Sequence, residues 1–203
     1  MSFYAQYGEE SIIIPFFNGK TNGFFVDIGA MDGITYSNTR YLVEQYNWRG
    51  ILVEPHPVFF ETLKSLYGNN DQITILNNAC LNKETEVDFF MYSTGQDACV
   101  STISESFKNR VISKHGDKFE YHPVKTQTKT LNSIINNNLV DFLSVDAEGV
   151  DMEVLSSNDW TKNRPSLVCV EHSMETYVLI DFIKSINYKE YAKTSGNTFF
   201  IPQ

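Results

Sequence analysis

The sequence predicts a doubly wound α/β domain, in which a mostly parallel sheet is covered by helices on both faces. Two observations support this prediction. Short apolar segments that end in a polar or acidic residue alternate with amphipathic helical segments, and the alternation occurs in both halves of the chain. Short connections in such an alternation are typical of right-handed parallel crossovers. Because we find no internal repeat and no linker, we expect residues 1–203 to form one domain.

The first half of the chain supplies three expected strands and two expected helices. The strands are residues 23–29, 50–55 and 73–79, each a short run rich in β-branched or aromatic residues. One helix covers residues 38–48, where apolar residues recur at helical spacing. The other covers residues 57–68, which begin with proline and end with glycine. This half therefore predicts three parallel strands joined by two helices.

The second half repeats the alternation after a polar interruption. The expected elements are helices at 130–137, 151–157 and 174–186, strands at 141–149 and 166–172, and an antiparallel edge pair at 188–194 and 198–202. The interruption, residues 93–120, is polar and rich in Ser and Lys, so we expect irregular structure there. Its length favours a lid or a substrate-selecting insertion, with a mobile loop as the alternative.

Composition narrows the function classes. The net charge of −9 argues against partners such as nucleic acid or an acidic membrane surface, both of which favour basic proteins. No apolar run is long enough for a membrane span, and no basic and apolar leader follows Met1. Cys80, Cys99 and Cys169 are odd in number and far apart, so we interpret them as reduced thiols. We therefore expect a cytoplasmic protein.

Polar side chains lie at the ends of five expected strands, where open α/β sheets bind their ligands. These strand-end residues are Asp27 with Gly29, Glu54, Asn78, Asp146 with Glu148, and Glu171 with His172. Strand interiors bury their side chains and avoid charged groups. The pattern therefore predicts a cleft lined with acids.

The first of these strand ends is unsuited to a dinucleotide. A pyrophosphate needs a G-x-G-x-x-G loop that opens into a helix, whereas Gly29 and Gly33 here flank Asp32. Carboxylates would repel a pyrophosphate but suit the ammonium and sulfonium groups of S-adenosylmethionine, and Glu54 is placed to accept hydrogen bonds from ribose hydroxyls. We favour S-adenosylmethionine. The alternatives are a nicotinamide-dependent oxidoreductase and a cofactor-binding module without catalysis.

Six blocks of the sequence also resemble a known family. They are "FYAQYGEESII" (3–13), "FFVDIGAMDGITYSNTRYLVE" (24–44), "WRGILVEPHPVFFETL" (48–63), "LNNACLN" (76–82), "FLSVDAEGVDMEVL" (142–155) and "RPSLVCVEHS" (164–173). In this order they resemble the FkbM family of S-adenosylmethionine-dependent methyltransferases. The resemblance implies a class I, Rossmann-like methyltransferase fold with seven strands, the last antiparallel. It also implies methyl transfer to a hydroxyl of a sugar, glycan or small natural product.

The resemblance further implies cofactor-binding roles at the matching positions. Asp27, Gly29 and Asp32 would hold the methionine end, Glu54 the ribose, Asn78 and Ala79 the adenine, and Gln6 and Gly8 would close over the cofactor. Two alternatives stay open: Asp27 could brace its own loop, and Asn78 could be a simple turn former. We expect His56 to lie in a loop without a role, and Tyr36 and Phe59 to be packing residues.

Catalysis requires that the acceptor hydroxyl lose its proton, either to a base or with the help of a metal. Asp146, Glu171 and His172 end two neighbouring strands and are the candidates for both roles. As metal ligands they would hold Mg²⁺ or Mn²⁺, in a layout similar to catechol-type and macrolide-sugar methyltransferases. Histidine is a poor Mg²⁺ ligand, however. In the competing mechanism His172 is the general base, oriented by Asp146 or Glu148.

Overall fold

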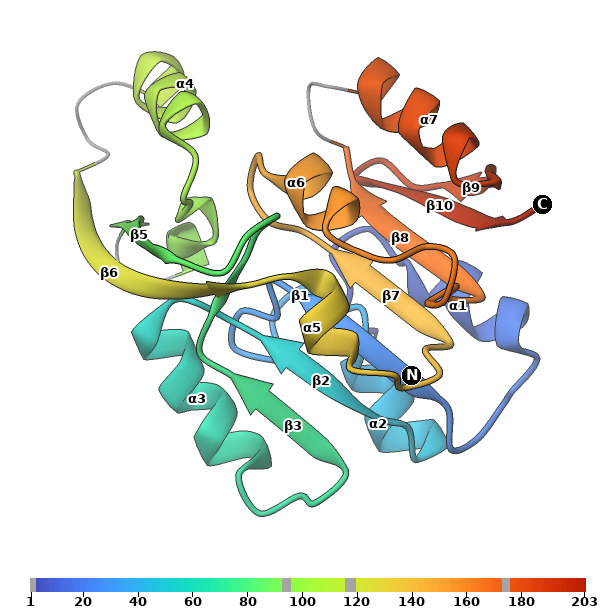
Figure 1. The fold of residues 1–203 in the computed structure, drawn as a ribbon. Coiled ribbons are helices and arrows are strands. Elements are labelled where there is room, and N and C mark those ends of the chain that lie inside the picture. Colours follow the sequence, from blue (N-terminus) through green and yellow to red (C-terminus); the bar gives the residue numbers. More distant parts are fainter. Residues whose placement is uncertain (1–2, 93–95, 116–119, 173–175) are drawn as a thin grey trace.

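A seven-stranded sheet lies at the centre of the computed structural model, which describes residues 3–92, 96–115, 120–172 and 176–203 (Figure 1). The order is β3-β2-β1-β7-β8-β10-β9. The strands are β1 (Phe24–Ile28), β2 (Arg49–Val53), β3 (Ile73–Leu76), β7 (Phe142–Val145), β8 (Leu167–Glu171), β9 (Tyr188–Lys193) and β10 (Asn197–Pro202). Neighbours from β3 to β8 are parallel, whereas β10 is antiparallel to both β8 and β9. The expected sheet with an antiparallel last strand is confirmed.

Helices cover both faces of this sheet (Figure 1). One face packs α1 (Glu10–Phe17), α2 (Arg40–Tyr46) and α3 (Pro57–Tyr67), and the other packs α5 (Leu131–Ile135), α6 (Asp151–Ser156) and α7 (Thr176–Ser185). Successive side chains of a strand point to opposite faces. Phe25 and Phe142 accordingly join the first cluster, and Val26 and Leu143 the second, all fully buried. Such continuously apolar strands are typical of a parallel sheet buried on both faces.

The chain leaves β1 toward β2 and β3 on one side, and the later strands β7 and β8 lie on the other. Ile28 pairs with Val53 in β2 and with Val145 in β7, so these three strands end at one level. This reversal of direction opens a crevice at the carboxyl ends of the strands. The predicted strand-end residues are therefore brought to one edge of the sheet.

A smaller sheet carries an insertion at this edge. It has the order β4-β6-β5, with β4 (Ala79–Cys80), β5 (Glu86–Tyr92) and β6 (Tyr121–Lys129). Between β5 and β6 lie the 3-10 helix η1 (Gln96–Val100) and the helix α4 (Glu105–His115). Because these two helices cover most of residues 93–120, the irregular structure expected there is wrong for most of that segment. Residues 93–95 and 116–119 lie outside the described residues.

Helix α1 and the β5–β6 pair were not expected from the sequence. Pro15 lies inside α1 and predicts a break, because proline removes a backbone donor. Strand β6 is mostly polar, so it lacks the alternation that marks a half-buried strand.

Among the described residues, no helix combines the length and the apolar character needed to cross a membrane.

Candidate active site

A cavity of about 530 Å³ lies at the carboxyl ends of β1, β2, β7 and β8. Its size is in the range of small-molecule and cofactor sites. Most residues predicted for the site line it, namely Gln6, Asp27, Gly29, Glu54, Asn78, Ala79, Asp146 and Glu171. Gly8, Asp32 and His172 are not among the lining residues.

The loop after β1 enters this cavity and requires glycine at position 29. Gly29 has a φ of +84°, and a Cβ there would lie 1.9 Å from the main-chain oxygen of Asp146. The amides of Gly29 and Ala30 both donate to the oxygen of Val53, at 3.0 and 3.1 Å. The loop is therefore fixed between the ends of β2 and β7.

Asp32 braces this loop from within. Its Oδ1 accepts hydrogen bonds from the amides of Ile34 and Thr35, at 2.8 and 2.7 Å, and its Oδ2 accepts from Thr35 Oγ1 at 2.8 Å. This is the behaviour of an Asx-type turn residue. The structure gives Asp32 a bracing role, and Asp32 is not among the lining residues of the cavity, so its contact with the methionine end stays a prediction.

Asp27 both braces the loop and faces the cavity. Its side chain is buried, and its Oδ2 accepts from Thr39 Oγ1 at 2.7 Å. Burial raises the pKa of Asp27 to about 6, and hydrogen bonds from Thr39 and Ser144 partly oppose that rise. The bracing role is therefore seen in the structure, and the cofactor contact of Asp27 stays a prediction that its place at the cavity supports.

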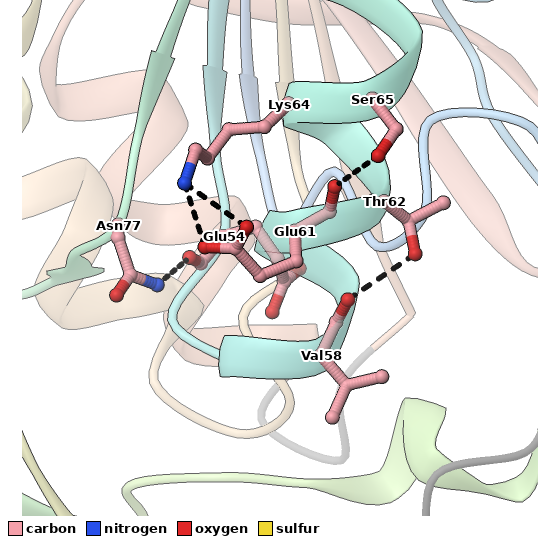
Figure 2. A network of polar contacts seen from close by, with 7 residues as sticks. All are labelled: Glu54, Val58, Glu61, Thr62, Lys64, Ser65 and Asn77. Atoms are coloured by element: carbon pink, nitrogen blue, oxygen red, sulfur yellow. Dashed lines mark hydrogen bonds and ion pairs between the residues drawn. The ribbon is translucent and has the colours of Figure 1, made fainter.

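Glu54 ends β2 at the other side of the loop and is also buried. Its Oε2 accepts from the amide of Met31 at 2.8 Å, and its Oε1 accepts from the amide of His56 at 2.7 Å. Burial raises the pKa of Glu54 to about 7, against these two hydrogen bonds. Figure 2 shows Asn77 donating to the main-chain oxygen of Glu54, at 2.9 Å, which fixes the strand end from β3. Each carboxylate oxygen keeps a second lone pair for a ligand.

One side of the cavity is an aromatic wall, formed by the rings of His56, Phe59 and Phe89. The sequence did not predict it. The ring of His56 packs on Phe59, with centroids 4.6 Å apart, and edge-on to Phe89 at 6.1 Å. All three rings line the cavity, as do Asn78 and Ala79. Phe59 packs in a buried cluster, as expected, and it also lines the cavity, as does Tyr36. His56 lies in the expected loop but is buried at the cavity. The spacing of His56 and Phe59 at the start of α3 could have indicated from the sequence that their rings lie together.

Three carboxylates meet at the ends of β7 and β8. Asp146, Glu148 and Glu171 each offer an oxygen within 4.8 Å of the others. Burial and mutual repulsion raise the pKa of Asp146 and of Glu148 well above the usual range. Burial, with repulsion from Asp151, raises the pKa of Glu171 to about 7. Asp146 Oδ1 is shielded from solvent and has no hydrogen-bond partner within the described part of the chain. This acid cluster has a strong tendency to take up a proton or a cation.

Glu148 enters the acid cluster through a strained turn. Its φ is +49°, a region that non-glycine residues rarely adopt and that is enriched at functional sites. Thr102 Oγ1 donates to the main-chain oxygen of Glu148 at 2.7 Å, and Phe107 packs where a Cβ on Gly149 would lie. Both partners belong to the insertion. The sequence predicts Glu148 as one of the acids at the cleft and as one of two residues that could orient His172, but not as a member of the catalytic set.

The structure does not bring His172 to the acid cluster. Its side chain is exposed, and its Nε2 lies 2.7 Å from Thr198 Oγ1. Glu171 lines the cavity, whereas His172, which follows the last residue of β8, does not. The place predicted for His172 is taken by Glu148.

The insertion also forms part of the cavity wall. Its lining residues are Ala98, Cys99, Val100, Ser101, Thr102, Ile103 and Lys114. The predicted lid or substrate-selecting insertion therefore stays a prediction, supported by residues that lie at the site.

Comparison with known proteins decides the family. The model of the methyltransferase FkbM domain matches residues 27–190. The chain belongs to the FkbM methyltransferase family. No curated protein matches the sequence significantly.

Solved structures show the same fold for this FkbM-family chain. Methyltransferase FkbM from Methylobacillus flagellatus superposes with a TM-score of 0.57 at 14% identity, over 89% of this chain and 43% of that one. A Clostridium thermocellum protein proposed to be an rRNA methylase superposes with a TM-score of 0.51 at 11% identity, over 100% of this chain and 97% of that one. The METTL16 methyltransferase domain superposes with a TM-score of 0.51 at 11% identity, over 94% of this chain and 64% of that one. The chain thus spans less than half of the Methylobacillus protein. These likenesses confirm a class I methyltransferase fold, which implies S-adenosylmethionine as the methyl donor.

Proposed function

We propose that this FkbM-family methyltransferase transfers a methyl group from S-adenosylmethionine to a hydroxyl oxygen of a sugar, a glycan or a small natural product. The observation that carries the proposal is the acid cluster of Asp146, Glu148 and Glu171 at one end of the cavity. Methyl transfer to an alcohol needs a proton acceptor or a cation at the acceptor oxygen, and the acid cluster can supply either.

The cavity suits the proposed cofactor along its length. Glu54 would accept hydrogen bonds from ribose hydroxyls, and the aromatic wall of His56, Phe59 and Phe89 offers faces for a flat base. Asp27 and the acid cluster complement the ammonium and sulfonium charges. When bound, the cofactor supplies an electrophilic methyl group. The same acids would repel the pyrophosphate of NAD, so the oxidoreductase alternative is disfavoured.

The acid cluster favours a hydroxyl acceptor over an amine. An alcohol ionises far above neutral pH, so its oxygen becomes nucleophilic only as a base removes the proton. Glu171 has a pKa of about 7, which suits a base that works near neutrality. An amine beside three carboxylates would be held as its ammonium form, which has no free electron pair. We therefore assign Glu171 as the proton acceptor, with a carboxylate oxygen of Asp146 within 4.8 Å of it.

A divalent cation is the competing means of activation. Three carboxylate oxygens within 4.8 Å of one another form a donor set that Mg²⁺ and Mn²⁺ prefer. Asp146, Glu148 and Glu171 would hold the ion, which would lower the pKa of a bound hydroxyl. The ligand set differs from the predicted one, because Glu148 replaces His172.

Binding and transfer experiments test the proposal in turn. Calorimetric titration should show saturable binding of S-adenosylhomocysteine and none of NAD, and the opposite pattern would exclude the proposed cofactor. Transfer of labelled methyl from S-adenosylmethionine to a panel of hydroxylated sugars and glycosides should then yield an O-methyl product, identified by NMR. An N-methyl product from matched amino sugars would contradict the acceptor assignment. Loss of turnover in EDTA, restored by Mg²⁺ or Mn²⁺, would favour the cation over the base.

A further inference from the structure

The outer wall of the cavity includes a segment at the start of the described chain, residues 4–8, which we name the N-terminal strap. Ala5 forms a bridge with Tyr36 in the loop after β1, and Gln6 and Tyr7 line the cavity. At its other end the ring of Tyr7 lies against Gly196, where a Cβ would be 2.0 Å from Tyr7 Cε2. The strap therefore runs from the β1–α2 loop to the β9–β10 turn.

That turn lies beside the acid cluster. Asn197, which follows Gly196, pairs with Glu171 in the sheet and itself lines the cavity. The strap thus crosses the carboxyl edge of the sheet at the reacting end of the site. Tyr7 is nevertheless 45% exposed, so burial of its ring does not account for its position.

Glu9 joins the strap to the turn. Its side chain is fully buried, and its Oε2 accepts from the amide of Tyr7 at 2.9 Å. Its Oε1 accepts from Thr194 Oγ1 at 2.7 Å and from Asn197 Nδ2 at 2.9 Å. One carboxylate therefore holds three separate groups: the strap, the end of β9 and a lining residue of the cavity.

The neighbouring Glu10 holds the other half of the strap. It is 1% exposed, and its Oε1 accepts from the amides of Tyr4 and Ala5, at 2.6 and 2.8 Å. Neither Glu9 nor Glu10 has an ion-pair partner within the described residues. Glu9 is at the N-cap position of α1 but makes no capping bond with its side chain. Burying a carboxylate that has no ion-pair partner is unfavourable unless hydrogen bonds satisfy it. The hydrogen bonds of Glu9 go to the strap and to the β9–β10 turn, and none of them caps α1, so they serve another purpose than helix formation.

We propose that Glu9 is a positioning residue that fixes the N-terminal strap across the cavity, so that bound cofactor leaves only when the strap detaches from the β9–β10 turn. The identity of the ligand rests on the proposed function. The attachment of the strap does not, because it follows from contacts within the chain.

Hydrogen exchange of the protein without ligand tests the attachment. In Glu9→Gln the new amide NH₂ faces either the Tyr7 amide, which can only donate, or the Thr194 hydroxyl and Asn197 amide that donate to Glu9, so at least one of these hydrogen bonds is lost or must reverse. Amides of residues 3–8 and 194–197 should exchange about tenfold faster or more, while β2 and α3 stay protected. Glu190→Gln is the matched control, because Glu190 pairs with Lys193 on the exposed edge strand β9. Unchanged exchange in Glu9→Gln would overturn the proposal.

Dissociation of S-adenosylhomocysteine tests the positioning role. Glu9→Gln should release it about tenfold faster, at a temperature where circular dichroism shows a folded protein, and Glu190→Gln should not. Tyr7→Ala should also release it faster, and Tyr7→Ala with Glu9→Gln should be little worse than either single change, since both act through the strap. Additive effects, or faster exchange with unchanged release, would overturn the role.

A second variant keeps the test decisive if Glu9→Gln does not fold. Thr194→Val removes one donor to Glu9 and leaves the buried charge in place, and it should also speed exchange of the strap and release of the ligand. Wild-type exchange and release in that variant would count against the proposal. If the wild-type protein did not bind S-adenosylhomocysteine, the proposed function would fail, whereas the exchange experiment would still decide whether Glu9 holds the strap.

Discussion

Gly29 touches the main-chain oxygen of Asp146 so closely that a Cβ would lie only 1.9 Å from it. The loop that faces the cofactor cavity and the strand end that starts the acid cluster are therefore in direct backbone contact. Because neither backbone can move without the other, the binding and reacting ends of the site are positioned together.

Gly29→Ala should be strongly destabilising. The new methyl group meets a backbone oxygen, and the φ of +84° is unfavourable for alanine, so we expect a loss of about 2 kcal/mol or more in the free energy of unfolding. Gly8→Ala is the control, because Gly8 has a similar φ of +76° but no atom within 4 Å of the added Cβ. Urea denaturation measures both. Equal losses would show that conformation alone, without the clash, explains the effect.

Stability should fall as the pH rises toward neutrality. Burial raises the pKa of Glu54 from 4.5 to about 7 and that of Asp27 from 3.8 to about 6. The folded state therefore holds these protons more tightly than the unfolded state, so stability is lost between the unfolded and folded pKa values, as the pH rises from about 4 to about 7. The urea midpoint should be higher at about pH 5 than at about pH 8. Glu54→Gln should flatten the slope over that range, and an unchanged slope would remove Glu54 as a contributor.

Glu171→Gln should separate chemistry from binding. Removing a positioned base slows the chemical step by roughly 10²–10⁴-fold, whereas the amide keeps the shape of the side chain. The wild-type rate should rise with pH through about 7, because the carboxylate must be ionised to accept a proton. Methyl-transfer rates measure the effect on the chemical step, and titration with S-adenosylhomocysteine measures the effect on binding. A rate near wild type in the variant would exclude Glu171 as the base.

His172→Ala should leave the rate and the cofactor affinity close to wild type. The imidazole is exposed and contacts Thr198, away from the acid cluster. Glu148→Gln is the informative partner, since it removes an ionisable group from the acid cluster and should reduce the rate. The reverse ranking of these two variants would restore the mechanism in which His172 is the base.

Thr102→Val should disturb the turn at Glu148. It deletes the 2.7 Å hydrogen bond to the Glu148 oxygen and the 2.8 Å hydrogen bond that Thr102 Oγ1 accepts from the amide of Ser104, which should reduce the free energy of unfolding by about 1–2 kcal/mol and lower the turnover rate. Thr62→Val is matched in chemistry, because Thr62 donates to the oxygen of Val58 on the exposed side of α3 (Figure 2). We expect that control to keep full turnover. Equal turnover in the two variants would show that the insertion does not support the acid cluster.

The central sheet was predictable because its strands are buried on both faces. Apolar runs such as residues 24–28 leave few alternatives to a buried strand, and the polar residue at each end marks the edge where ligands bind. Asp27, Glu54, Asp146 and Glu171 were found in this way. Strand-end position alone does not fix the direction of a side chain, so it could not separate Glu171 from its neighbour His172.

The remaining parts depend on tertiary contacts. Strand β6 and helix α4 have little apolar periodicity, and their positions depend on pairing with β5 and on contacts such as Phe107 against Gly149. The left-handed turn at Glu148 is likewise held by Thr102, which lies in another segment. The direction of Asp32 follows from its own loop, which an Asx motif could have indicated.

The order of synthesis gives the contact between Glu9 and Thr194 a further meaning. The two residues are 185 positions apart, so the strap is synthesised long before its partners. Contacts this distant in sequence form late, because the entropy of closing so long a loop must be overcome first. The cavity is therefore completed only after the β9–β10 hairpin has paired. A ligand that needs the closed cavity would therefore select chains in which the strap has already docked on this hairpin.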